Sequence, residues 1–238
     1  MFHMLGEPRS PLVFPPSTFR DGLRRLSEDG YRSVDLVEAA GLVRAGAGFP
    51  PGSLVLTFDD ALGSVVDVAL PLFEELGWTA TVFATTGILG GTTPQGWPVA
   101  DAGALRELQA AGLSIGAHTV SHPDLSRSPT ERVRTELRDG KERLEDLLGA
   151  PVSAFAYPFG RYDRRSRDIA AELYVCACTD RLRFARAGDD PWLLPRVETW
   201  YLSEGGRLAR LGSKRVSVYL AARRVPRNLR RAVSGSPV

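Results

Sequence analysis

Short apolar runs alternate along the chain with segments in which apolar residues recur at helical spacing. Leu54–Phe58 and Leu113–Ala117 are the clearest apolar runs, and the first is typical of a strand buried on both faces. Three more runs predict further strands at Thr79–Ala84, Val152–Tyr157 and Tyr174–Cys178. Strands separated by helical segments favour a mainly parallel α/β sheet.

The intervening segments carry helix start and stop signals. Ser17 is a predicted N-cap for a helix that is followed by Gly30, and Asp163 is a predicted N-cap for a later one. Ser128 is a third, because proline and an acidic residue follow it in the first turn. Further helices are predicted at about 64–76, with a disturbance at Pro71, at 101–111, and from the Ser128 cap to about 148.

Polar side chains follow two of the apolar runs directly. Asp59 and Asp60 come after the first, and His118 and His122 come after the second, although the chain has only three histidines. Carboxylate and imidazole groups can bind a divalent metal, which leaves the neighbouring carboxylate free for proton transfer. A helix N-cap with an acidic first turn would also explain the aspartates, and coincidence would explain the histidine pair.

About seven strand–helix units in some 200 residues favour a barrel-like closure over an open sheet. In parallel barrels the chemical groups lie at the carboxyl ends of the strands. The aspartate pair, His118 and the turn Tyr157–Gly160 all follow predicted strands. We therefore expect them to meet at one rim.

Three segments resemble the first three motifs of the polysaccharide deacetylase family, the NodB homology domain of carbohydrate esterase family 4. They are Thr57–Asp60, His118–Leu125 and Phe155–Gly160, in the family's order and spacing. The resemblance covers most of residues 1–200. It implies a distorted (β/α)7-type barrel with mainly parallel strands. It also implies metal-dependent removal of an acetyl group from an N-acetylated sugar, with Zn²⁺ the usual metal.

The resemblance also implies roles for individual residues. Asp60, His118 and His122 would bind the metal, and Asp59 would be the general base that takes a proton from water. Because a nearby cation lowers a carboxyl pKa, Asp59 should be ionised. The backbone N–H of Tyr157 would donate to the oxyanion.

Two positions depart from the family pattern. The family's C-terminal Leu-x-His motif, which supplies the acid for the leaving amine, is absent, because no histidine follows His122. The remaining histidine, His3, resembles the one that opens the circularly permuted poly-N-acetylglucosamine deacetylase branch, so we expect His3 to be the general acid. The alternative is a frayed terminal residue. Ala156 lies where many members have a polar residue in the arginine-containing third motif, and we expect Arg196 to supply that charge instead.

Charge divides the chain unevenly. Residues 1–204 carry a net charge of −7, whereas residues 205–238 contain nine basic and no acidic residues. We therefore predict a catalytic domain at 1–204 and a basic C-terminal tail at 205–238. Three interpretations of the tail stay open: a solvated or disordered end, an interfacial segment on anionic lipid, or a nucleic-acid contact, which we do not expect because no recognised module is present.

Composition excludes some classes of protein. No apolar stretch reaches the length of a membrane span, and the first residues lack the features of a signal peptide. We therefore expect a cytoplasmic protein, with the inner membrane face as a site of peripheral association if the tail binds lipid. The two cysteines, Cys176 and Cys178, are interpreted as small core residues, with a C-x-C metal site as the alternative.

The predicted function is a metal-dependent carbohydrate N-deacetylase. Its expected partners are an N-acetylated glycan or a lipid-linked sugar, and the tail adds an anionic membrane surface. Two alternatives remain: a deacetylase or deformylase of a lipid-linked or small sugar, and a catalytically weak carbohydrate-binding relative.

Overall fold

Five parallel strands form the centre of the molecule. The computed structural model describes residues 1–233, with side chains described as far as residue 227. The strands are hydrogen-bonded in chain order: β5 (Thr57–Phe58), β6 (Thr81–Ala84), β7 (Ser114–Ala117), β8 (Ala154–Ala156) and β9 (Cys176–Cys178). All four pairings are parallel, so the carboxyl ends of the strands lie at one rim.

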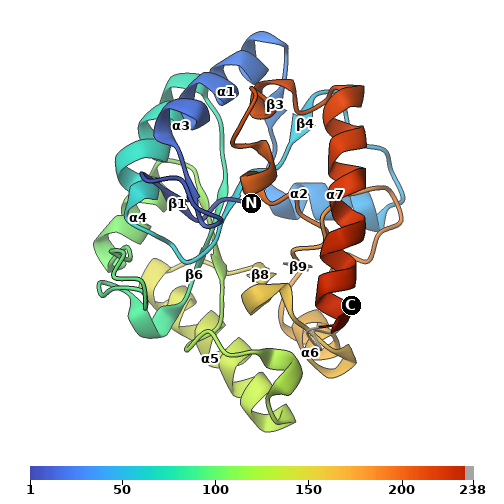
Figure 1. Ribbon diagram of the computed structural model, residues 1–238. Helices are drawn as coiled ribbons and strands as arrows, with labels where there is room; N and C mark the ends of the chain where they lie inside the picture. The colour runs from blue at the N-terminus through green and yellow to red at the C-terminus, as the bar shows by residue number, and fades with distance from the viewer. Residues whose placement is uncertain (234–238) are drawn as a thin grey trace.

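Single bridges extend the sheet at both edges. Phe2 pairs in parallel with β5, and Leu194 pairs in parallel with β9. The two added segments then meet, because the backbone N–H and the hydroxyl of Thr199 both donate to the carbonyl of Met1. The seven segments curl into a distorted (β/α)7-type barrel, which confirms the predicted fold class. Figure 1 shows the beginning of the chain inside the ring of helices.

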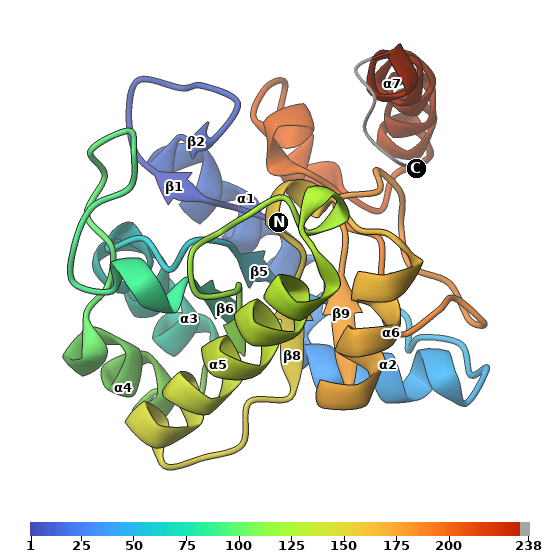
Figure 2. The same cartoon turned by 90° about the horizontal axis from the view of Figure 1, so that it is seen from below.

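Helices surround these strands (Figure 1). They are α1 (Pro16–Glu28), α2 (Leu36–Arg44), α3 (Leu70–Leu76), α4 (Ala102–Ala110), α5 (Thr130–Leu148), α6 (Arg164–Leu173) and α7 (Lys214–Val233). Two small parallel pairs complete the regular structure: β1 (Met4–Leu5) with β2 (Val13–Phe14), and β3 (Arg32–Ser33) with β4 (Ser53–Leu54). Figure 2, turned by 90°, again places α7 at the periphery.

Aromatic packing fixes the first residues of the chain. The Phe2 ring stacks on the Phe58 ring of β5 at 5.2 Å between centroids. It also meets the edges of Phe14 and Phe19 at 5.2 and 5.1 Å. All four side chains are buried, and such pairs add to the stabilisation from buried area. This cluster places the residue after Phe2, the predicted acid His3, at the edge of β5.

The predicted strand Leu54–Phe58 is two strands in different sheets. The carbonyl of Leu54 accepts from Val34 beside β3, whereas the carbonyl of Leu56 accepts from Thr81 at the start of β6. The chain therefore changes partners at Val55. A continuous apolar run gives no sign of such a change, because apolar character does not depend on which strand is the neighbour.

Two of the three predicted serine or aspartate caps need correction. Helix α1 begins at Pro16 with Pro15 as its N-cap, and Ser17 lies inside the first turn. Helix α5 has Pro129 as its N-cap, and the Ser128 hydroxyl instead donates to the carbonyl of Asp124. Ser17 lies two positions after the true cap and Ser128 one position before it, because a proline occupies the N-cap in both helices. The predicted cap Asp163 is confirmed, with a reciprocal hydrogen bond to Ser166.

The predicted helix at 64–76 changes type before its proline. A π-helical turn at Val65–Ala69 leads into α3, and Pro71 lies in the first turn of α3. In the first turn a backbone N–H has no helical partner, so proline is tolerated there. The irregular part of the predicted helix is therefore the π-helical turn that precedes Pro71.

The hydrophobic core continues beyond the predicted boundary at residue 204. Leu208, Leu211, Val216 and Leu220 are buried in the main cluster. The side chain of Leu208 packs so closely on Gly22 of α1 that a Cβ there would lie 2.6 Å from it. Residues 205–227 thus form part of the domain rather than a disordered end. The predicted tail residues 234–238, and the side chains of Leu229, Arg230 and Arg231, lie outside the described residues.

Both cysteines are buried, as predicted, in a smaller apolar cluster that also contains Phe83 and Leu194. Neither forms a disulfide. Burial raises the pKa of the Cys178 thiol to about 11, so it is protonated at neutral pH. Among residues 1–233, no helix combines the length and the apolar character that crossing a bilayer would require.

Candidate active site

Strained backbone is concentrated in the loops that follow β5, β7 and β8. Within the described part of the chain, every residue other than glycine with a positive φ lies in one of these loops. They are Asp60, Ala61, Thr119, His122 and Phe159, with φ between 48° and 71°. Left-handed conformations are costly for such residues and persist where the surroundings impose them. The three loops therefore hold their side chains in particular orientations.

Three of the predicted residues place one ligand atom each at a common point. Nε2 of His118 and Nε2 of His122 each lie 3.7 Å from Oδ1 of Asp60, and the two nitrogens lie 3.2 Å apart. Ligands of one tetrahedral zinc ion, at 2.0–2.1 Å from the metal, are separated by about 3.3 Å. The three atoms could thus hold one small divalent ion with little movement.

The buried ring of His118 is oriented by the sheet. Its Nδ1 lies 2.7 Å from the carbonyl oxygen of Ala156 on β8, which can only accept, so Nδ1 carries the proton. Nε2 then has its lone pair directed at Asp60 and His122. Burial is the main cause that lowers the pKa of His118, to about 4, so the ring is neutral at pH 7. A neutral imidazole is the form that binds metals.

A carboxylate from α5 holds the loop that carries His122. Glu136 is buried, and its Oε2 accepts hydrogen bonds from the backbone N–H groups of Val120 and Ser121 at 2.9 and 2.8 Å. Its Oε1 accepts from the Ser121 hydroxyl at 2.5 Å. The N–H of His122 donates to the Thr119 hydroxyl at 2.9 Å. The left-handed turn at Thr119 and His122 is therefore stabilised from both sides.

The carboxylate of Asp59 forms an ion pair with the guanidinium group of Arg196. Arg196 donates from Nη1 to Oδ1 of Asp59 at 2.6 Å and from Nη2 to Oδ2 at 2.8 Å, and both residues are buried. The Nε of Arg196 donates to the carbonyl of Thr179. Burial alone would raise the pKa of Asp59, but the charge and hydrogen bonds of Arg196, together with the nearby His118 and His3, outweigh burial and hold that pKa well below its usual range.

The structure brings His3 to the same carboxylate. Its Nε2 lies 4.0 Å from Oδ2 of Asp59, and its side chain is 16% exposed. Asp59 is therefore close to both His3 and Arg196, and it is adjacent in the chain to Asp60 of the cluster with His118 and His122. The frayed-end alternative does not fit this position, because His3 follows Phe2 in the aromatic cluster.

The role predicted for Tyr157 does not fit the structure. Its backbone N–H donates to the carbonyl of Cys178 at 3.1 Å, as part of the pairing of β8 with β9. Its hydroxyl donates to the carbonyl of Trp192 at 3.0 Å. Both donors are thus engaged by carbonyl groups of the protein, and the side chain is fully buried. We therefore assign no oxyanion role to Tyr157.

Two residues of the site were not predicted from the sequence. Glu136 lies among the buried positions of α5 (Val133, Leu137, Gly140 and Leu144), so an acidic residue on an apolar helix face was its available signal. Phe159 is 55% exposed, and its ring lies 4.6 Å from that of His122 between centroids. Its signal was weaker, since only the following glycine indicates an unusual turn.

A further ion pair joins two of the loops. Arg161 follows the turn after β8 and donates to Oδ2 of Asp124 at 2.8 Å. Asp124 comes two residues after His122 and accepts from the backbone and the hydroxyl of Ser126. The pair therefore fixes the loop of the histidines relative to the loop that carries Phe159.

Comparison with known proteins agrees with this geometry. Residues 47–177 match the family model described as "Polysaccharide deacetylase". The putative polysaccharide deacetylase YxkH of Bacillus subtilis (strain 168) is 24% identical over 174 residues, which are 71% of this chain and 59% of that protein. The chain thus spans less than two thirds of this relative's length.

Two solved structures have a similar fold. The Streptococcus pyogenes deacetylase PplD in complex with acetate has a TM-score of 0.74 and 26% identity, over 82% of this chain and 88% of that one. IcaB from Ammonifex degensii has a TM-score of 0.77 and 23% identity, over 88% and 94%. The family model alone covers more than half of the present chain. The chain therefore belongs to the polysaccharide deacetylase family.

Proposed function

We propose that this protein is a metal-dependent hydrolase that removes acetyl groups from an N-acetylated sugar or polysaccharide. The observation that supports this most is the cluster of Asp60, His118 and His122 beside an ionised Asp59. A divalent metal bound by that cluster, with Zn²⁺ as first choice, would polarise an amide carbonyl and make a water molecule more acidic. The relatives that are named as deacetylases support the reaction type.

Asp59 is the proposed general base. Its pKa is held low by Arg196, so it is a weak base and is ionised at every physiological pH. A bound metal would make a water molecule more acidic, which lowers the basicity that is required of the carboxylate. Arg196 has the role of a positioning residue, since both of its Nη atoms bond to Asp59 and fix the carboxylate plane.

His3 is the proposed general acid. Amide hydrolysis requires a proton for the leaving amine, and Nε2 of His3 lies 4.0 Å from Oδ2 of Asp59. The other two histidines of the chain belong to the proposed metal cluster. His3 is therefore the imidazole that remains available for proton donation.

Acetate release from N-acetylglucosamine oligomers tests the reaction. With Zn²⁺ supplied, we expect turnover by the unaltered protein. Asp59→Asn should abolish turnover while the metal stays bound. Asp60→Asn should abolish both turnover and metal binding. A folded, metal-loaded protein that releases no acetate from any acetylated sugar would support the binding-only alternative instead.

His3→Ala tests the acid. We expect kcat to fall by about 10²–10⁴-fold while the bound zinc, measured by elemental analysis, is unchanged. His3→Gln is the matched control for side-chain volume and should be equally slow, because an amide cannot donate the proton that an imidazolium donates. Unchanged turnover in both variants would refute the assignment.

A further inference from the structure

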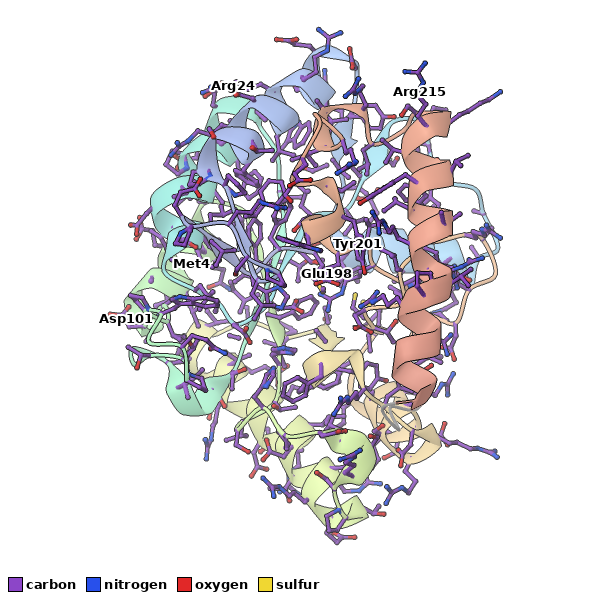
Figure 3. All side chains as sticks on the ribbon, in the orientation of Figure 1. Met4, Arg24, Asp101, Glu198, Tyr201 and Arg215 are labelled. Carbon is purple, nitrogen blue, oxygen red and sulfur yellow. The ribbon has the colours of Figure 1, made fainter. Side chains whose placement is uncertain are left out.

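Helix α7 packs on the domain through one face. Val216 and Leu220 are buried against the core, and Arg227 forms ion pairs with Asp180 at 2.7 Å and with Glu198 at 3.4 Å. In Figure 3, Glu198 and Tyr201 lie between the strands and α7, whereas Arg215 lies at the outer edge. These contacts fix which side of α7 faces away from the domain.

The outward side of α7 combines apolar and basic residues. Val218 is 69% exposed and Val225 is 58% exposed, and their spacing of seven places them on one side of the helix. Lys214 and Arg215 lie one turn before Val218, and Arg224 precedes Val225. Among the described residues, no ion pair involves these three cations, and residues 205–238 contain no acidic residue.

A loop near α7 carries a further exposed aromatic ring. Phe184 is 40% exposed, and it lines, together with Ser217 of α7, a mainly apolar cavity of about 450 Å³ on the domain side of the helix. The outward side of α7 itself we call the outer basic surface. It consists of Lys214, Arg215, Val218, Arg224 and Val225.

We propose that the outer basic surface docks on an anionic lipid bilayer, with α7 lying parallel to the membrane. The unpaired cations complement anionic lipid head groups, and the two valines can enter the region of the first acyl carbons. An amphipathic helix with basic and apolar residues on its free face is typical of interfacial binding. The phosphates of a nucleic acid would pair with the arginines, but the exposed valines would stay in water. This inference does not depend on the proposed chemistry.

Sedimentation of the full chain with vesicles tests the docking. We expect binding to phosphatidylcholine vesicles that contain phosphatidylglycerol and little binding to phosphatidylcholine alone. Arg215→Glu/Arg224→Glu should weaken binding by about tenfold or more. Arg143→Glu/Arg164→Glu, an equal change of charge at exposed positions of α5 and α6, should bind as the unaltered protein does.

The apolar contribution has its own variants. Val218→Ser/Val225→Ser should weaken vesicle binding severalfold, whereas Val175→Ser, at an exposed valine elsewhere, should not. Thermal unfolding and acetate release should be unchanged in these α7 variants, which separates this test from that of the proposed function. Equal binding by the α7 variants and their controls would overturn the proposal. Binding to duplex DNA without binding to anionic vesicles would also overturn it.

Discussion

The ion pair of Asp59 and Arg196 is buried, so neither charge can exchange its partner for water. Removing one member of such a pair leaves an uncompensated charge inside the protein. Arg196 is held in turn by the carbonyl of Thr179 and the hydroxyl of Thr57, so its guanidinium is nearly saturated with acceptors. The orientation and the ionisation of Asp59 therefore depend on a residue 137 positions away in the sequence.

Arg196→Gln should lower the free energy of unfolding by about 3–5 kcal/mol in urea titrations at pH 7. Asp59→Asn/Arg196→Gln should recover part of that loss, because no lone charge remains. Arg24→Gln is the matched control. Arg24 makes the same two-bond contact with Glu75, at 2.8 Å and 2.8 Å, but the pair is exposed, so the effect should be small. Equal losses at both sites would contradict this account of Asp59.

Phe159 keeps a left-handed conformation, with φ of 58° and ψ of 10°, although its ring is more than half exposed. Left-handed backbone costs a residue with a side chain roughly 1–2 kcal/mol. Burial of the ring returns little of that cost. We infer that the ring contributes to the site beside His122, as a surface on which a sugar ring can pack.

Phe159→Gly should therefore have opposite effects on stability and on function. The melting temperature should stay the same or rise, because glycine adopts this conformation without strain. KM for N-acetylglucosamine oligomers should increase severalfold with a smaller change in kcat. A lower melting temperature with unchanged KM would mean that the ring is structural.

At the scale of elements, α5 and the loop after β7 act as one unit. Glu136 accepts three hydrogen bonds from Val120 and Ser121, and Gly140 lets the helix approach Thr119 so closely that a Cβ would lie 3.2 Å from its backbone. The helix thus supports the turn that directs His122 toward His118. Groups that orient metal ligands in this way influence metal affinity strongly.

Glu136→Ala should weaken zinc binding by about 10–100-fold in calorimetric titrations, although every proposed ligand is retained. It leaves two backbone N–H groups without their acceptor, so the loop should lose its fixed conformation. Glu142→Ala, at an exposed position of the same helix, controls for the loss of one acidic residue. Equal zinc affinity in the two variants would limit Glu136 to a role in stability.

The sequence predicted those elements whose determinants are local. Alternating apolar runs located β6, β7 and β9, and Asp163 marked the start of α6, because periodicity and capping depend on neighbouring residues. The division of Leu54–Phe58 depends on which distant strand lies beside it. The N-cap of α5 was predicted one residue too early, at Ser128, because proline rather than serine occupies that position in the structure.

The site followed a similar rule. The proposed metal ligands lie in short motifs, so the resemblance of those motifs to the family identified them, and the structure then placed them together. The availability of the Tyr157 N–H depends on pairing with Cys178, 21 positions later, and local sequence does not reveal it. The role of residues 205–220 was missed for a different reason. The positive charge of this segment indicated a separate tail, whereas its apolar residues pack into the hydrophobic core.

At the scale of the whole molecule, the proposed metal should stabilise the fold, because its ligands come from two separate loops. A ligand that binds the native state alone stabilises it by about 2.7 kcal/mol at a hundredfold excess over Kd. Chelation should then lower the melting temperature of a domain of this size by about 5–10 °C in calorimetry, and added Zn²⁺ should restore it. Asp60→Asn should show no such response. An unaltered protein that melts identically with and without zinc would contradict the proposed metal site.

The closure of the barrel has a consequence for the order of folding. Met1 bonds to Thr199 across 198 positions, and Arg196 reaches Asp59 across 137. Contacts between such distant residues form late, since the loops that they close are long, and they slow folding. A ribosome must release residue 199 before the ring can close, so Met1 has to wait for most of the domain before it can bond to Thr199. The ion pair that orients the proposed base therefore forms only after almost the whole domain has been synthesised.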